Sequence, residues 1–178
     1  MDEVICIDDG SSDASARIAE ACGATVIRHR VNRGYGGALK TLFLRASELD
    51  ADALVLLDSD GQHETADIPK LLAPILSGEA DFAIGSRFVD GGGGTDMPAY
   101  RRLGIKVITA ASNLSSELGI RDTQSGFRAF SRTALERLRF DSEGMELSLE
   151  MLEDAHEKQL NVLEVPTVIR YDVPKGSN

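Results

Sequence analysis

The chain alternates between short apolar runs and longer stretches in which apolar residues recur three or four positions apart. The short runs predict β-strands over residues 1–7, 24–28, 54–57 and 81–85. The longer stretches between them predict helices, because their apolar residues gather on one helical face. Strands that alternate with helices in this way favour a three-layer α/β/α sandwich around a mostly parallel central sheet.

The predicted helices of this first half are bounded by residues that start or stop helices. Ser11 or Ser12 is expected to cap the first helix and Asp67 the third, while Gly23 and Gly78 end them. The residues expected to face inward are Ile18, Ala21, Cys22, Leu39, Leu42, Phe43, Ala46, Leu49, Leu71, Leu72, Ile75 and Leu76.

The second half of the chain also alternates between predicted strands and helices, but less regularly. It predicts a helix over 100–118, a strand over 127–131, a helix over 146–160, and strands over 162–165 and 167–171. No internal repeat or shift in composition divides the chain. We therefore predict a single domain over residues 1–171, followed by a loose polar tail over residues 172–178.

Two carboxylates follow the strand predicted over residues 54–57. Asp58 and Asp60 would lie at the carboxyl end of that strand, where open α/β sheets bind their ligands. Two hard oxygen ligands this close together favour Mg²⁺ or Mn²⁺, with the coordination completed by a substrate's phosphates. The alternative is an acidic turn that caps the next helix.

The ends of the other strands carry polar groups as well. Asp9 follows the first strand. Its carboxylate either accepts hydrogen bonds from a nucleobase or a ribose, or it only stabilises the turn by bonding to nearby backbone groups. The glycine-rich loop 32–37 precedes a helix and could hold an anion through its backbone N–H groups. Arg87 follows the fourth strand. Four polar strand ends indicate one shared site.

Two further segments have alternative interpretations. The run Gly91–Gly94 is either a lid that orders over a ligand or a surface connection. Arg101 and Arg102 open the helix predicted over 100–118, where they oppose the helix dipole unless an anion binds there, and solvated arginines are the alternative. His63 is expected to be structural or to support a ligand, and His29 and His156 are interpreted as ordinary surface or interface residues.

Composition narrows the class of protein. The formal net charge of −10 argues against nucleic-acid binding and means that an anionic substrate must meet locally concentrated arginines. No apolar run reaches the roughly 18 to 20 residues that a membrane span needs. Cys6 and Cys22 lack metal or redox spacing and are expected to be core residues in a reducing compartment. These features favour a soluble globular protein, and we expect it to be cytoplasmic.

Five short segments resemble those of the family 2 glycosyltransferases, and they occur in the same order. The segments are Asp8-Asp9-Gly10-Ser11-Ser12-Asp13, Asn32-Arg33-Gly34, Asp58-Ser59-Asp60-Gly61-Gln62-His63, Gly85-Ser86-Arg87 and Ser125-Gly126-Phe127-Arg128. Within that family the chain most resembles the polyprenyl-phosphate and dolichyl-phosphate mannose and glucose synthases. The resemblance extends from about Asp2 to Tyr171.

The resemblance implies a GT-A fold and a metal-dependent, inverting transfer of a hexose from a UDP- or GDP-linked donor to a polyprenyl or dolichyl phosphate. The reaction would take place at the cytoplasmic face of a membrane, with Mg²⁺ or Mn²⁺ held by Asp58, Asp60 and Gln62. Catalytic roles would fall on Asp60, Arg87 and Arg128. Residues that match substrate-binding positions are Asp8, Asp9, Gly34, Asp58, Ser59, Asp60, Arg87, Arg101, Arg102, Ser125 and Arg128.

The chain departs from the family pattern in two places. Family members begin with an earlier strand, so we expect the first strand to be missing, which leaves an open sheet edge and suggests a truncated chain, a misplaced start or a homodimer that shares a strand. The Q-x-x-R-W element of processive synthases is also absent, which favours a single transfer.

Alternative functions are a nucleotide-sugar-binding domain with impaired catalysis, and a family 2 enzyme with another glycan or lipid acceptor. A phosphohydrolase with Asp58 as its nucleophile and a sugar nucleotidyltransferase explain fewer of the motifs.

Overall fold

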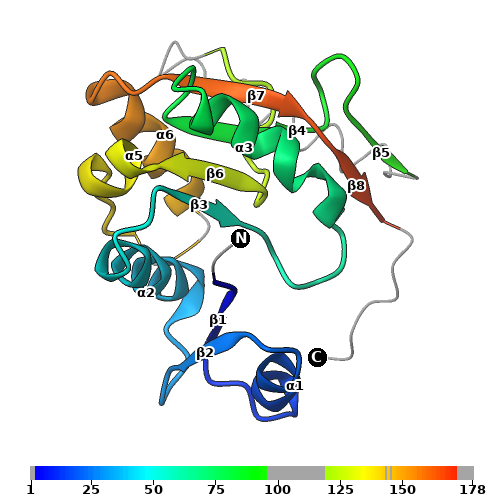
Figure 1. Cartoon of the computed structure of the whole chain (residues 1–178), viewed down its shortest axis with the longest axis vertical. Coiled ribbons are helices and arrows are strands. Elements are labelled where there is room, and N and C mark those ends of the chain that lie inside the picture. Colours follow the sequence, from blue (N-terminus) through cyan, green and yellow to red (C-terminus); the bar gives the residue numbers. More distant parts are fainter. Residues whose placement is uncertain (1–2, 96–118, 143, 145, 172–178) are drawn as a thin grey trace. The chain divides into compact units, whose positions relative to one another are not determined.

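The computed structural model of this chain describes residues 3–95, 119–142, 144 and 146–171. The helix predicted over 100–118, with Arg101 and Arg102, and the predicted tail over 172–178 lie outside these residues. The chain groups into two compact units, of which the first comprises residues 1–50 and 140–147 and the second residues 51–139 and 148–178. Figure 1 shows the elements of both units. The single domain over residues 1–171 stays a prediction.

The first unit contains a small parallel sheet and two helices. Its elements are β1 (Ile5–Asp8), α1 (Ser15–Ala21), β2 (Thr25–Arg28) and α2 (Gly34–Glu48). β1 and β2 are parallel, with Ile5 opposite Thr25 and Asp8 opposite Arg28. The predicted apolar face of α2 is confirmed at Leu39, Leu42, Phe43 and Ala46, which are all buried. The ring of Phe43 meets Phe140 edge-on at 5.0 Å.

Helix α1 differs from its prediction in its cap and its buried face. No side chain caps it at the N-cap residue, and the Asp13 carboxylate instead accepts the backbone N–H of Ser15 at 2.9 Å. Ala16 is its buried residue, whereas Ile18 and Cys22 are exposed. The predictions that Ile18 and Cys22 face inward are therefore wrong, because a helix of two turns buries only a narrow stripe.

The second unit is built on a four-stranded sheet. Its elements are β3 (Ala53–Leu56), the 3₁₀ turn η1 (Thr65–Asp67), α3 (Ile68–Leu76), β4 (Phe82–Ser86), β5 (Gly93–Thr95), β6 (Arg128–Ser131), α5 (Arg132–Arg137), α6 (Leu147–Glu157), β7 (Val162–Pro166) and β8 (Val168–Arg170). The order of strands is β3-β6-β4-β7, and β5 pairs with β8 separately. β6 is antiparallel to both β3 and β4, so this sheet is mixed, although most strand directions agree with the predicted parallel arrangement.

Helices cover both faces of this sheet, which confirms the α/β class and the three layers within the second unit. On one face, Leu71 and Ile75 of α3 pack in a cluster with Ala83, Ala129 and Val165 of the strands. Because side chains alternate between faces along a strand, the neighbours of those residues face the other way. There the Arg128 side chain reaches Met151 of α6.

Several strands have a single partner in the part of the chain that the structure describes. β1 is paired with β2 alone, and β3 is paired with β6 alone. Every open sheet ends in strands of this kind, so the expectation of an edge left open by a missing first strand stays a prediction. Within the described residues, no helix combines the length and the apolar character needed to cross a bilayer.

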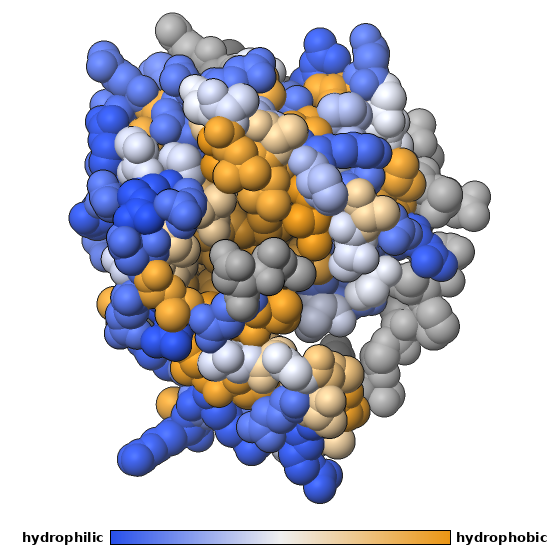
Figure 2. Space-filling model, viewed as in Figure 1, coloured by the Kyte–Doolittle hydropathy of each residue, from blue (hydrophilic) through white to orange (hydrophobic). Residues whose placement is uncertain are grey.

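Replacing Leu71 with alanine is expected to lower the free energy of unfolding by about 2–5 kcal/mol, because its side chain is fully buried between α3 and the sheet. Leu76→Ala is the matched control. Its side chain is 68% exposed, against prediction. Figure 2 shows that apolar side chains also gather on the surface over α3. The control should change stability by about 0.5 kcal/mol or less. Urea unfolding measures both, and equal losses would contradict the packing described.

Candidate active site

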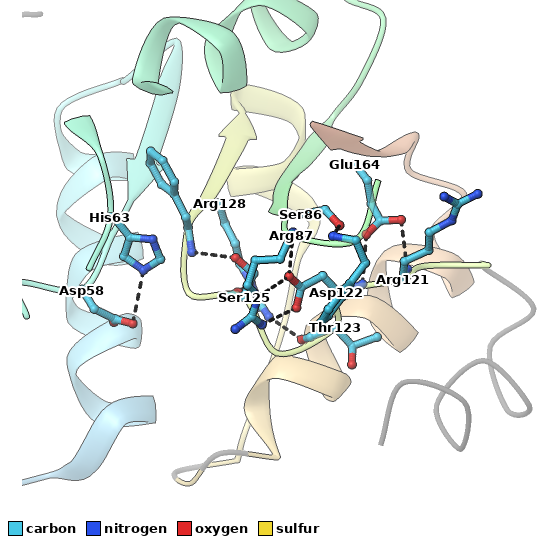
Figure 3. Close-up of polar contacts among 12 residues, drawn as sticks. Asp58, His63, Ser86, Arg87, Arg121, Asp122, Thr123, Ser125, Arg128 and Glu164 are labelled. Carbon is cyan, nitrogen blue, oxygen red and sulfur yellow. Dashed lines mark hydrogen bonds and ion pairs between the residues drawn. The ribbon is translucent and has the colours of Figure 1, made fainter. Parts of the chain in front are cut away.

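Strand ends from distant parts of the chain meet at one edge of the second unit's sheet. In the register of this sheet, Arg128 lies opposite Leu56 on one side and Ile84 on the other. The residues just beyond that level are Asp58 after β3, Arg87 after β4 and the loop that precedes β6 (Figure 3). Because β6 runs antiparallel to its neighbours, its beginning lies at their carboxyl ends.

The Asp58 carboxylate is seated against a glycine of that loop. A Cβ built on Gly126 would overlap Oδ2 of Asp58 and would lie 3.1 Å from its Cγ. The Asp58 side chain is nevertheless 47% exposed. Because Gly126 has no side chain, the Asp58 carboxylate can occupy this position. One side of the carboxylate stays open to a ligand.

The turn that follows Asp58 is held by hydrogen bonds to its own backbone and to β8. Asp60 accepts the backbone N–H of Gln62 through Oδ1 at 2.9 Å, and the Gln62 carbonyl accepts the N–H of Arg170 at 2.9 Å. His63 Nε2 lies 3.8 Å from Asp58 Oδ2, and the ring packs on Phe127 at 5.0 Å. This position agrees with a supporting role for His63. Asp58, Ser59 and Asp60 are all exposed.

Arg87 is buried and bound to Asp122 rather than open to solvent. Its Nε donates to Asp122 Oδ2 at 2.6 Å, its backbone N–H donates to the same oxygen at 3.0 Å, and Nη1 donates to the Tyr171 hydroxyl at 2.7 Å. Burial alone would lower the pKa of the Arg87 guanidinium, but the hydrogen bonds and charge of Asp122 outweigh burial and raise the pKa. Arg87 therefore stays charged and fixed in direction.

Arg128 organises the loop between Asp122 and β6. Its guanidinium is fully buried and donates to the carbonyls of Ser125 at 2.8 Å and Thr123 at 3.1 Å (Figure 3). The Ser125 side chain is buried as well. The direct substrate contacts expected of Arg87, Arg128 and Ser125 stay predictions, since the structure assigns these side chains to the loop itself.

Two carboxylates of this site are absent from the residues predicted to form it. Asp122 is the partner of Arg87, and Glu164 of β7 accepts the backbone N–H groups of Arg121 and Asp122, both at 2.9 Å. A lone glutamate within an otherwise apolar strand is a sequence signal that could have indicated Glu164. Nothing in the sequence pattern pairs Asp122 with Arg87.

In the first unit the two neighbouring aspartates have different surroundings. Asp8 is buried, accepts the N–H of Ser11 at 3.0 Å and pairs with Arg28 Nε at 2.9 Å, so it holds the turn. Asp9 has a side chain that is 20% exposed, and its Oδ1 accepts the backbone N–H of Arg33 at 2.8 Å. Asp9 is thus the better placed of the two to meet a ligand.

The pKa of the Asp9 carboxyl lies below its ordinary value. Partial burial raises this pKa, but hydrogen bonds from His29 and from the backbone N–H groups of Arg33 and Gly34 outweigh burial. The interpretation of His29 as an ordinary surface or interface residue is wrong, because its side chain is buried and hydrogen-bonded within the first unit.

The loop after β2 packs closely on the turn after β1. Gly10 has a φ of +80°, and a Cβ there would lie 3.1 Å from the backbone nitrogen of Asn32. Gly34 opens α2 with a φ of +74°, and its N–H is bound by the Asn32 side chain at 3.0 Å. Asp9 and Gly34 therefore belong to one local cluster. A site shared with the aspartates of the second unit stays a prediction.

The residues predicted to hold a metal ion offer oxygen ligands that suit Mg²⁺ or Mn²⁺. Among the described residues, no three side chains of His, Cys, Asp or Glu converge on a metal position. Two exposed carboxylates and the Gln62 amide leave coordination positions for substrate phosphates, as Mg²⁺ commonly requires. The donor chemistry and the open face of Asp58 fit such an ion.

Gly126→Ala is expected to weaken Mn²⁺-dependent nucleotide binding by about tenfold or more, because the added Cβ displaces the Asp58 carboxylate. Gly93→Ala is the matched control, since a Cβ at Gly93 meets nothing within 4 Å. Calorimetric titration with UDP or GDP measures both variants. Unchanged affinity in Gly126→Ala, with the fold intact by circular dichroism, would contradict the placement of Asp58.

The chain matches the model of glycosyl transferase family 2 over residues 1–139. It is 31% identical over 199 residues to a UDP-N-acetylglucosamine–dolichyl-phosphate N-acetylglucosaminyltransferase of Methanococcus voltae, an alignment that covers 99% of this chain and 79% of that protein. It is 33% identical over 170 residues to a dolichol-phosphate mannosyltransferase of Pyrococcus furiosus, covering 92% of this chain and 47% of that protein.

Among solved structures, the chain resembles glucosyl-3-phosphoglycerate synthase from Mycobacterium tuberculosis in complex with Mn²⁺, UDP-glucose and phosphoglyceric acid. The TM-score is 0.74 and the sequence identity 26%, and the match covers 99% of this chain and 62% of that chain. The chain thus spans less than two thirds of the length of that solved structure.

Proposed function

The chain belongs to glycosyl transferase family 2 and has the GT-A fold, and from this premise we propose that it transfers a hexose from a UDP- or GDP-linked donor to a polyprenyl or dolichyl phosphate. The observation that carries the proposal is the exposed turn of Asp58 and Asp60, seated against Gly126 at the carboxyl edge of the sheet. The names of the two relatives support this acceptor, because one names dolichyl phosphate and the other dolichol phosphate.

Asp58, Asp60 and Gln62 would hold Mg²⁺ or Mn²⁺ in this reaction. When bound, the ion would supply positive charge for the departing nucleoside diphosphate. Asp9 would accept hydrogen bonds from the nucleobase or ribose through its carboxylate, whose lowered pKa keeps it ionised. Arg87 and Arg128 would act by holding the loop of residues 122–126 beside Asp58.

The chemistry requires little of the protein beyond positioning and charge. An oxygen of the acceptor phosphate attacks the anomeric carbon from the side opposite the diphosphate, and the bond from that carbon to the diphosphate oxygen breaks. The electron pair leaves with the nucleoside diphosphate, and the configuration inverts. Because a phosphate monoester is already anionic at neutral pH, no strong general base is needed.

A lipid phosphate places the reaction at a membrane surface, and we assign it to the cytoplasmic face. A second candidate acceptor is a small phosphorylated acid, favoured by the likeness to the synthase solved with phosphoglyceric acid. Both acceptors share a phosphate group.

A second copy of this chain is a further proposed partner, since β1 and β3 each have an open edge in the described residues. Light scattering would show the dimer.

Labelled UDP- and GDP-hexoses, supplied with Mn²⁺, test the proposal against three acceptors. These are a short polyprenyl phosphate in detergent, the same polyprenol without phosphate, and 3-phosphoglycerate. We expect label in the polyprenyl phosphate alone. Label in 3-phosphoglycerate would support the second candidate, and nucleotide binding with no transfer to any acceptor would replace the proposal with a binding domain of impaired catalysis.

A further inference from the structure

His29 connects the turn after β1 with helix α2 inside the first unit. It follows β2 directly, and its backbone N–H donates to the Asp8 carbonyl at 2.9 Å. Its side chain is 7% exposed. Nδ1 lies 2.6 Å from Asp9 Oδ1, and Nε2 lies 2.8 Å from the Thr41 hydroxyl oxygen. Both ring nitrogens therefore have a partner, and Asp9 is one of them.

The chemistry of these partners determines where the proton lies. An ionised carboxylate only accepts hydrogen bonds, and the lowered pKa of Asp9 keeps it ionised at neutral pH. Nδ1 must therefore carry a proton that it donates to Asp9. The Thr41 hydroxyl either donates to the Gly37 carbonyl at 3.0 Å and accepts from Nε2, or turns to donate to Nε2. The proton on Nδ1 is the same in both arrangements.

The hydrogen bonds to Asp9 fix how its carboxylate is turned. His29 Nδ1 and the backbone N–H of Arg33 both donate to Oδ1, at 2.6 and 2.8 Å. With Oδ1 committed to the protein, Oδ2 is the oxygen that we expect a ligand to meet. We propose that His29 is a positioning residue, which holds Asp9 in the orientation that binds the nucleoside of the donor. This inference rests on the proposed nucleoside contact of Asp9.

Two amide variants of His29 separate the two hydrogen bonds. Asparagine places an N–H donor near the position of Nδ1, so His29→Asn keeps the contact with Asp9 and loses the one with Thr41. Glutamine reaches the position of Nε2, so His29→Gln keeps Thr41 and loses Asp9. In titrations with UDP and GDP in the presence of Mn²⁺, we expect His29→Gln to weaken binding of the preferred nucleotide about tenfold and His29→Asn to leave it within about threefold of the original chain.

A merely structural role for His29 would not produce this difference. Equal affinities for both variants, whether reduced or unchanged, would overturn the inference. Asp9→Asn separates this outcome from failure of the proposed function. If Asp9→Asn binds the nucleotide as well as the original chain, the proposed nucleoside contact is wrong. If it binds weakly while His29→Gln is unaffected, only the role of His29 is wrong.

A measurement on the unmodified chain keeps the inference testable if a variant fails to fold. The sequence has three histidines, so ¹⁵N labelling of histidine gives a small set of ring signals. We expect the Nδ1 signal of His29 to be that of a protonated nitrogen and to shift when UDP or GDP is added with Mn²⁺. His156 is the internal reference and should not shift. A deprotonated Nδ1 in His29 would overturn the inference.

Discussion

Replacing Asp60 with alanine is expected to reduce hexose transfer by more than about 100-fold. Loss of a residue that only orients a metal ligand costs about 10- to 100-fold in metal affinity or activity, and loss of the ligand itself should cost more. Asp60 is exposed in a turn that its own carboxylate stabilises through the N–H of Gln62. The rate of transfer from the preferred nucleotide-sugar at saturating Mn²⁺ measures the effect.

Asp52→Ala is the matched control for this prediction. Asp52 lies at the other end of β3, its side chain is 88% exposed, and it pairs with Arg132 at the surface. Such exposed pairs contribute about 0–1 kcal/mol, so the control should keep its activity. Asp60→Ala with a transfer rate within a few-fold of the control would contradict the assignment of Asp60 to the metal site.

Replacing Arg87 with methionine is expected to lower the free energy of unfolding by about 3–5 kcal/mol. The reason is that Asp122 is fully buried and would lose the charge that compensates it. Removing one partner of a buried pair leaves the other charge in a medium that solvates it poorly. Urea unfolding at neutral pH measures the loss.

A double variant and an exposed arginine complete this experiment. Arg87→Met combined with Asp122→Leu removes both charges and should recover a large part of the lost stability, because buried pairs can often be replaced by apolar residues. Arg30→Met, at an exposed position of the first unit, should change stability by about 0.5 kcal/mol or less. A single Arg87→Met variant as stable as the original chain would contradict the buried pair.

The regular elements near the site could be predicted from the sequence because their signals are local. An unbroken apolar run followed by a glycine turn predicted β3 and the position of Asp58 and Asp60 after it. The apolar period of α2 predicted the buried side chains of Leu39 and Leu42. Such patterns depend on residues within one turn or one strand, so the sequence displays them directly.

The partners of charged residues could not be predicted in the same way. Arg87 was expected to contact substrate, which stays a prediction, but its partner Asp122, 35 positions away, was not anticipated. A sequence shows that a cation is present without showing which carboxylate the fold brings to it. The insertion of β6 between β3 and β4, antiparallel to both, is equally non-local. The prediction that Leu76 faces inward is wrong for another reason. A folded surface retains much apolar area, so an apolar residue in a helical pattern is not always buried.

Calorimetric titration of this chain with UDP and with GDP, in Mn²⁺ and then in EDTA, is the direct test of a metal-dependent nucleotide-sugar site at Asp58 and Asp60. We expect one nucleotide to bind in Mn²⁺, and we expect that binding to be lost both in EDTA and in the Asp60→Ala variant. Absence of binding by either nucleotide in Mn²⁺, or binding that EDTA leaves unchanged, would contradict a metal-dependent nucleotide-sugar site at Asp58 and Asp60.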